Sequence, residues 1–235
     1  MNNVVNEVKS KVQIFMGEDI SLLHFSNLPD DILGILPDVW AKLAVEKLTT
    51  KDRIGIIWSP AMEEGEQIGQ VICSGCEDLF LLYSPRSAIP VKMCYIYHQL
   101  TSYHCLVGNP PNNLEPLVNA ANIIAVPYSY RLFAKIHDGF CVDGDSSMGL
   151  YPTKELTLIS QHPDYQIDEI INEPKSNSLL MFSGNGLGDL QCYDLDQSID
   201  HDYYTFFWDH ETRNIYKPQL FWDYLASFIR EKFGS

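Results

Sequence analysis

The sequence predicts an α+β protein in which a mostly antiparallel, curved sheet is flanked by helices. Short runs of β-branched and aromatic residues recur along the chain, and turn-forming residues separate them, which is typical of antiparallel strands. The chain also carries a late segment whose large apolar residues recur at helical spacing. Its 235 residues are 46% hydrophobic and 20% charged, a composition typical of a packed globular protein.

The first half of the chain begins with helical signals and continues with strand signals. Residues 26–48 (SNLPDDILGILPDVWAKLAVEKL) have apolar residues near helical spacing, and we expect one or two helices there. Beyond them the apolar runs become short and are separated by turn-forming residues. We expect strands at RIGIIW (53–58), IGQVIC (68–73), DLFLLYS (78–84), KMCYIYH (92–98) and YHCLV (103–107).

A connector rich in proline and asparagine, GNPPNNLEP at residues 108–116, divides the chain. We therefore expect two units. Residues 1–110 would form an N-terminal extension of helix and antiparallel strands, and residues 111–235 would form a second α+β domain.

Helices are expected near both ends of the second unit. Pro127 suits the first position of a helix, and Gly139 suits the residue after its end. His137 lies at the expected end of this helix, where the helix dipole favours an imidazole. The last expected helix, within residues 217–233, carries a wide apolar stripe made of Leu220, Phe221, Tyr224, Leu225, Phe228 and Ile229.

Residues 179–195, LLMFSGNGLGDLQCYDL, place Gly184, Gly186 and Gly188 between two apolar runs. A phosphate-binding loop would need a helix after the glycines, so that backbone N–H groups face the anion. The run LQCYDL follows instead, and it has the pattern of a strand. The segment therefore predicts a β-hairpin whose glycines serve the backbone, and it predicts no bound cofactor.

Two patterns resemble metal sites but lack the required ligands. Residues 194–202 (DLDQSIDHD) space acidic residues as a calcium loop does, yet Ile199 and Thr205 occupy the positions of its glycine and glutamate. Cys73 and Cys76 form a C-x-x-C motif without a second pair, and we interpret them as structural thiols in a turn between strands. A metal or redox role for this pair stays a weaker alternative. No residues form a recognisable catalytic constellation, so we expect no enzyme.

The formal net charge of −15 repels nucleic acid and anionic membranes, and it complements a basic protein partner. The segment MNNVVNEVKSKVQIF lacks the apolar core of a secretory signal. No run approaches the roughly 20 apolar residues that a membrane span needs. Without export, six cysteines are expected to be reduced thiols, and we expect a cytoplasmic protein.

Four motifs of the second half occur in an order that resembles the SUKH superfamily, which includes the yeast cell-wall-synthesis regulators and many bacterial immunity proteins. They are VPYSYRLFAKIHDGF, MGLYPTKEL, LLMFSGNGLGDLQCYDL and FWDYLASFIREKF. The resemblance covers residues 113–235, about half of the chain. Residues 1–110 have no counterpart in it, and they would be an extra β layer or a divergent partner module.

The resemblance implies an α+β binding module without catalysis. Many SUKH proteins neutralise a toxin domain of nuclease or deaminase type, and toxins that act on nucleic acid are often basic. We therefore expect an immunity protein that binds a basic toxin domain, with a regulatory adaptor of the cell-wall-regulator type as the alternative. The carboxylates expected to contact the partner are those of Asp194, Asp196, Asp200 and Asp202, which would cluster at a sheet edge.

Overall fold

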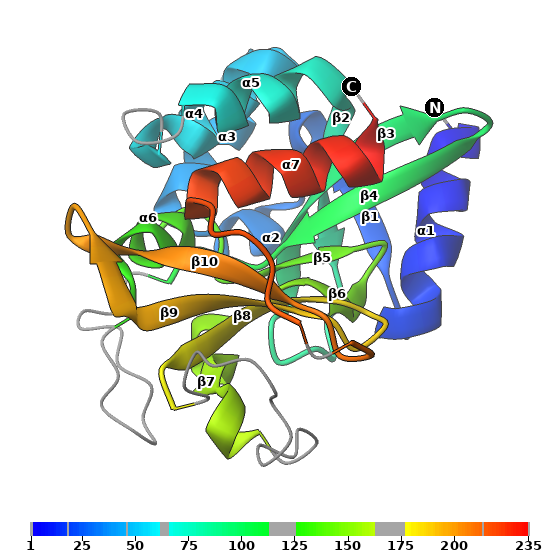
Figure 1. Cartoon of the computed structure of the whole chain (residues 1–235). Helices are drawn as coiled ribbons and strands as arrows, with labels where there is room; N and C mark the ends of the chain where they lie inside the picture. The colour runs from blue at the N-terminus through cyan, green and yellow to red at the C-terminus, as the bar shows by residue number, and fades with distance from the viewer. Residues whose placement is uncertain are drawn as a thin grey trace.

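A computed structural model of the chain describes residues 2–17, 19–45, 47–61, 66–112, 126–162, 177–212 and 214–234. One antiparallel sheet of ten strands crosses this described part, and helices pack on it (Figure 1). The strands are β1 (Ser21–His24), β2 (Cys76–Tyr83), β3 (Val91–Gln99), β4 (Ser102–Gly108), β5 (Phe140–Val142), β6 (Asp145–Leu150), β7 (Thr157–Leu158), β8 (Leu179–Asn185), β9 (Leu190–Ile199) and β10 (Asp202–Trp208). The helices are α1 (Asn2–Met16), α2 (Asp30–Leu33), α3 (Asp38–Val45), α4 (Thr50–Trp58), α5 (Glu66–Gly75), α6 (Tyr128–Ala134) and α7 (Phe221–Phe233). The predicted α+β class, with its antiparallel sheet and N-terminal extension, is confirmed.

The strands follow one another in the order β1-β2-β3-β4-β5-β6-β8-β9-β10, and β7 pairs with β8. At the middle of this order β4 pairs with β5, so that Leu106 lies opposite Val142. The sheet therefore passes from residues 1–110 directly into residues 111–235. The division into two domains at this point stays a prediction, and residues 113–116 of the connector lie outside the described residues.

Both faces of the central strands are buried, because successive side chains of a strand point to opposite faces. On β2, Leu79 and Leu81 face the large core beneath α3 to α7, whereas Phe80 and Leu82 pack with α1. The same alternation continues along β8 and β9, where Tyr193 faces the large core. Strands that are buried on both faces have nearly continuous apolar sequences, and the sequences of these strands follow this pattern.

Two of the expected strands are helices. RIGIIW forms most of α4, and IGQVIC lies within α5. The buried residues of α4 include Ile54, Ile57 and Trp58, whose i, i+3, i+4 spacing is helical. A capping box formed by Thr49 and Asp52 starts the helix. The strand prediction was wrong because it weighed the β-branched composition above this spacing.

The remaining helix predictions hold in outline and differ at their ends. Residues 26–48 contain two helices, α2 and α3. Pro127 caps α6 from outside instead of occupying its first turn. Helix α6 ends at Ala134 with Lys135 as its C-cap, so the expectation that Gly139 directly follows the helix end was wrong, although Gly139 does have a φ of +96°. In α7 the predicted stripe is buried at Phe221, Leu225, Phe228 and Ile229, whereas Leu220 precedes the helix and is 43% exposed.

The predicted hairpin at residues 179–195 is confirmed, since β8 and β9 pair across the glycine turn. Gly186 and Gly188 have φ values of +79° and +104°, which residues with a side chain rarely adopt. A side chain at Gly184 would instead collide with the hydroxyl of Tyr151. Gly186 and Gly188 therefore serve the backbone, as the sequence indicated, whereas Gly184 leaves room for the Tyr151 side chain.

The two edges of the sheet differ. At one edge β1 is only four residues long. At the other edge β10 is followed by an extended segment that folds back along it, with isolated bridges between Thr205 and Gln219 and between Trp208 and Ile215. This segment occupies hydrogen-bonding groups on the outer side of β10.

Candidate functional site

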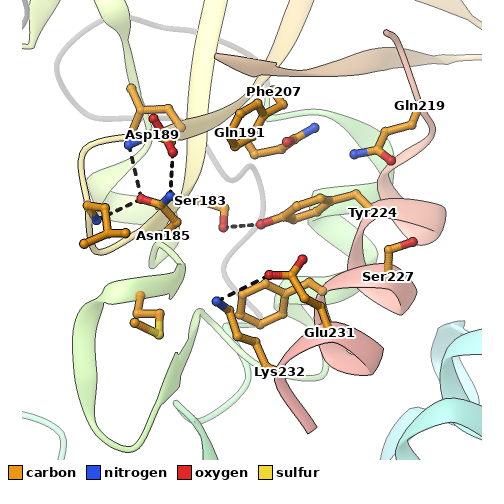
Figure 2. A pocket seen from close by; sticks show the side chains of 15 residues that line it. Ser183, Asn185, Asp189, Gln191, Phe207, Gln219, Tyr224, Ser227, Glu231 and Lys232 are labelled. Atoms are coloured by element: carbon orange, nitrogen blue, oxygen red, sulfur yellow. Dashed lines mark hydrogen bonds and ion pairs between the residues drawn. The ribbon is translucent and has the colours of Figure 1, made fainter. Parts of the chain in front are cut away.

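An open pocket of about 570 Å³ lies in the second half of the chain, between α7 and the strands β8, β9 and β10 (Figure 2). Its apolar lining comes from Met148, Leu190, Phe207 and Phe228. Pockets of this size with an apolar lining and a few polar groups are typical of binding sites. The pocket is therefore the first candidate for a functional site.

Helix α7 forms one wall of the pocket because one of its faces is apolar and buried and the adjoining face carries polar side chains. Phe221, Leu225 and Ile229 are buried in the large core and fix the helix on the sheet. Tyr224 and Ser227 lie on the adjoining face and line the pocket. The same helix thus anchors itself and presents polar side chains to the cavity.

The inner polar groups of the pocket are bonded to one another. The hydroxyls of Ser183 and Tyr224 lie 2.6 Å apart, and burial raises the pKa of Tyr224. The Gln191 amide donates to Thr205 Oγ1 at 3.1 Å, and that hydroxyl donates to the carbonyl of Gln219. The partner of Ser183 is a neutral phenol, so the pair lacks the base that a nucleophilic serine requires.

The hairpin turn between β8 and β9 forms one side of the pocket mouth. Asn185 Oδ1 accepts hydrogen bonds from the backbone N–H groups of Leu187 and Asp189, at 2.8 and 3.2 Å. Its amide nitrogen donates to Asp189 Oδ2 at 2.7 Å. The turn is thereby held in a shape that leaves the Leu187 side chain 76% exposed.

Asp189 also pairs with His210, which the sequence analysis did not identify. The two side chains meet at 2.7 Å between Oδ1 and Nδ1, and this hydrogen bond raises the pKa of His210. Asp209 lies nearby. One side-chain oxygen or nitrogen from each of Asp189, Asp209 and His210 lies within 4.8 Å of the other two. The carboxylates already accept hydrogen bonds from Asn185, His210 and backbone N–H groups, so the cluster is explained by an ion pair within the protein.

The two cysteines of the C-x-x-C motif do not lie in a turn between strands. Cys73 is on α5, and Cys76 begins β2, where its thiol donates to the carbonyl of Asp78. Burial raises the pKa of both thiols. They are therefore protonated at neutral pH, whereas a metal ligand or an attacking nucleophile is a thiolate.

The four aspartates expected to contact a partner lie on the β9–β10 hairpin but in different surroundings. Asp194 is 1% exposed and accepts hydrogen bonds from the backbone of Asp196 and the amide of Gln197, at 3.0 and 2.7 Å. Asp202 is half-buried and accepts from the backbone N–H of Ser129 at 3.1 Å. Asp196 and Asp200 are exposed.

These aspartates lie near the end of the hairpin that is remote from the pocket. Strand β9 begins at Leu190, which lines the pocket, and ends at Ile199, beside the turn at Asp200 (Figure 1). The structure therefore does not bring the predicted contact residues to the pocket. The pocket combines residues from five separate segments, and the local sequence pattern gave no signal for that arrangement.

His137 is a buried hydrogen-bonding group and does not interact with the helix dipole as a cation. It is 0% exposed, its Nδ1–H donates to the carbonyl of Asn109 at 2.9 Å, and its Nε2 accepts from the Tyr95 hydroxyl at 2.7 Å. The indole N–H of Trp58 donates to the same hydroxyl. Burial lowers the pKa of His137 to about 3, so the imidazole is neutral. The sequence interpretation was wrong because it placed this residue at a solvated helix end.

A second row of hydrogen bonds lies beside β4. His104 Nε2 is 3.0 Å from the Ser102 hydroxyl, and its Nδ1 is 2.7 Å from the Asp143 carboxylate. The ammonium of Lys11, from α1, lies 3.4 Å from both ring nitrogens and donates to the carbonyl of Tyr103. The row therefore fastens α1 to the sheet, and the pocket beside α7 does not reach it.

The fold is of the α+β class, and it contains an open pocket. Among the described residues that line this pocket, no nucleophile lies in contact with a base. Residues 120–231 match the model of the SMI1/KNR4 family (SUKH-1). This match, over slightly less than half of the chain, is consistent with the SUKH superfamily, and the matched region contains the pocket except for Lys232. Members of the superfamily typically bind protein partners and are generally not catalytic.

No curated protein and no solved structure matches the chain. None of the helices in the described ranges has the length and hydropathy needed to cross a bilayer.

Proposed function

We propose that this chain is a non-catalytic protein-binding module, an immunity protein that binds and neutralises a toxin domain of nuclease or deaminase type. The observation that carries the proposal is the pocket within the SUKH region, which offers apolar surface but no reactive pair among its described lining residues. Such a site suits recognition better than chemistry. Because a toxin of this type acts on nucleic acid inside the cell, we place the protein in the cytoplasm.

The partner is proposed to be basic. A net charge of −15 attracts a basic domain over a long range and raises its rate of association. We assign the first contacts to Asp196 and Asp200, which are exposed on the β9–β10 hairpin. Asp194 and Asp202 would contribute by holding the shape of this hairpin through their hydrogen bonds to Ser129, Asp196 and Gln197.

Co-expression with the toxin domain encoded beside this gene tests the proposal. Growth should be rescued, and the association rate constant should fall as salt concentration rises. The double variant Asp196→Lys with Asp200→Lys should slow association. The double variant Asp31→Lys with Glu77→Lys changes the net charge equally at exposed positions outside the SUKH region, and it should slow association less.

Failure of rescue would contradict the immunity role and would favour the regulatory adaptor of the cell-wall-regulator type. Association that ignores salt and is equally fast for both double variants would contradict the electrostatic mechanism.

A further inference from the structure

We propose that the pocket beside α7 receives an apolar side chain, aromatic or large aliphatic, from a partner segment that also carries lysine or arginine next to it. This inference rests on the proposed protein-binding function and specifies the chemistry that the pocket recognises. It concerns the end of β9 that is remote from Asp196 and Asp200 (Figure 1).

The inner wall favours an apolar occupant because its polar groups are already bonded. Ser183 and Tyr224 bond to each other, and Gln191 bonds to Thr205. An entering apolar group therefore breaks no hydrogen bond of this wall, and each of these polar groups keeps its partner. A polar ligand would have to compete with bonds that the protein makes internally.

The size and lining favour a side chain together with some of its backbone. The volume of about 570 Å³ lies within the range of ligand pockets, well above the space for a single methyl group. Phe207 and Phe228 provide aromatic surface for stacking, and Met148 provides a flexible thioether that adapts to different shapes. At protein interfaces, buried anchors in such pockets contribute most of the affinity.

The mouth favours a cation beside the anchor. Glu231 is 77% exposed at its side chain, and Asp189 lies on the facing turn (Figure 2). Asp209 and Glu211 add negative charge close to His210, and both act to raise its pKa. Lys232, whose ammonium lies 3.6 Å from Glu231, and His210, which pairs with Asp189, offset only part of this charge. The exposed Leu187 side chain, next to these acids, gives an apolar contact for the same segment.

Short peptides test the pocket without knowledge of the natural partner. The probes are the capped pentapeptides Lys-Lys-Phe-Lys-Lys, Lys-Lys-Ala-Lys-Lys and Glu-Glu-Phe-Glu-Glu, followed by NMR of the methyl groups of Met148, Leu187 and Leu190. We expect the basic phenylalanine peptide to shift these signals in a saturable way. The alanine peptide and the acidic peptide should each need at least a tenfold higher concentration for the same shift.

A pocket-filling variant gives the second readout. Ser227→Trp places a large ring on the exposed pocket-facing side of α7 without changing charge, and Gln70→Trp makes the same kind of change on the exposed side of α5. We expect Ser227→Trp to abolish the shifts and to raise the Kd for the toxin domain at least tenfold. Gln70→Trp should leave both unchanged.

The outcomes separate this inference from the proposed function. Equal shifts from the phenylalanine and alanine peptides, or equal shifts from the basic and acidic ones, would overturn the inference. So would a toxin domain that binds Ser227→Trp as tightly as the unmodified chain, although the immunity role would then stand. Peptide binding at the pocket without rescue by any toxin domain would support the inference and contradict the immunity role.

Discussion

Acidification should destabilise this protein through His137, because the folded state holds this imidazole neutral. Its pKa is lowered from 6.5 to about 3 by burial. Below pH 6.5 the unfolded chain binds a proton at this residue, whereas the folded chain does not until the pH nears 3. The stability that the neutral imidazole contributes is therefore fully present above pH 6.5 and is lost as the pH falls.

The size of the effect follows from one proton. A difference of one bound proton changes the unfolding free energy by about 1.4 kcal/mol per pH unit, so that lowering the pH from 6.5 to 5 removes about 2 kcal/mol. The hydrogen bonds explain why the protonated form is unfavourable. A proton on Nε2 would face the Tyr95 hydroxyl, which now donates to that nitrogen and accepts from Trp58.

Urea unfolding at pH 7, 6 and 5 measures this dependence in the unmodified chain and in His137→Gln, which keeps a donor and an acceptor but does not titrate. We expect the variant to be less stable at pH 7 and the difference to shrink by about 1.4 kcal/mol per pH unit below 6.5. His201→Gln, at the exposed hairpin turn, is the control and should keep the full dependence. Parallel curves for the unmodified chain and His137→Gln would refute the reasoning.

Three further predictions concern packing. Phe228→Ala should lower the unfolding free energy by about 3–5 kcal/mol in urea titrations, because this ring is only 7% exposed between α7 and the sheet. An unchanged urea midpoint would show that α7 is peripheral. Gly108→Ala should lower the unfolding free energy by about 2 kcal/mol, and with it Tm, because the new Cβ would lie 2.5 Å from His137 Nδ1. An unaltered Tm would contradict that close approach. His104→Ala should speed amide hydrogen exchange within α1 and leave exchange in α7 unaffected, because it removes the ring beside Lys11. Equal changes in both helices would argue against a role of His104 in fastening α1 alone.

Local signals were enough to predict part of the fold. The glycine turn at residues 179–195 and the last helix depend on neighbours in the chain, so their patterns are complete within a short window. The helices at residues 53–58 and 68–73 show the opposite case, since isoleucine and valine are common in strands and only the spacing of the buried residues is helical.

The pocket and the buried polar contacts could not be predicted in the same way. Asp189 and His210 are 21 positions apart, and His104 and Asp143 are 39 apart. These pairs meet only because the strand order brings the segments that carry them together. His137 became a core residue because Tyr95 and Trp58, from the other half of the chain, close over it.

The covering of β10 has a consequence for how molecules of this protein meet one another. An uncovered long edge strand can pair with the edge of a second copy and so begin aggregation. Here the bridges at Gln219 and Ile215 occupy that edge, and the opposite edge strand is only four residues long. At high concentration, sheet-to-sheet growth along β10 is disfavoured, and a partner that approaches this end must recognise side chains instead of extending the sheet.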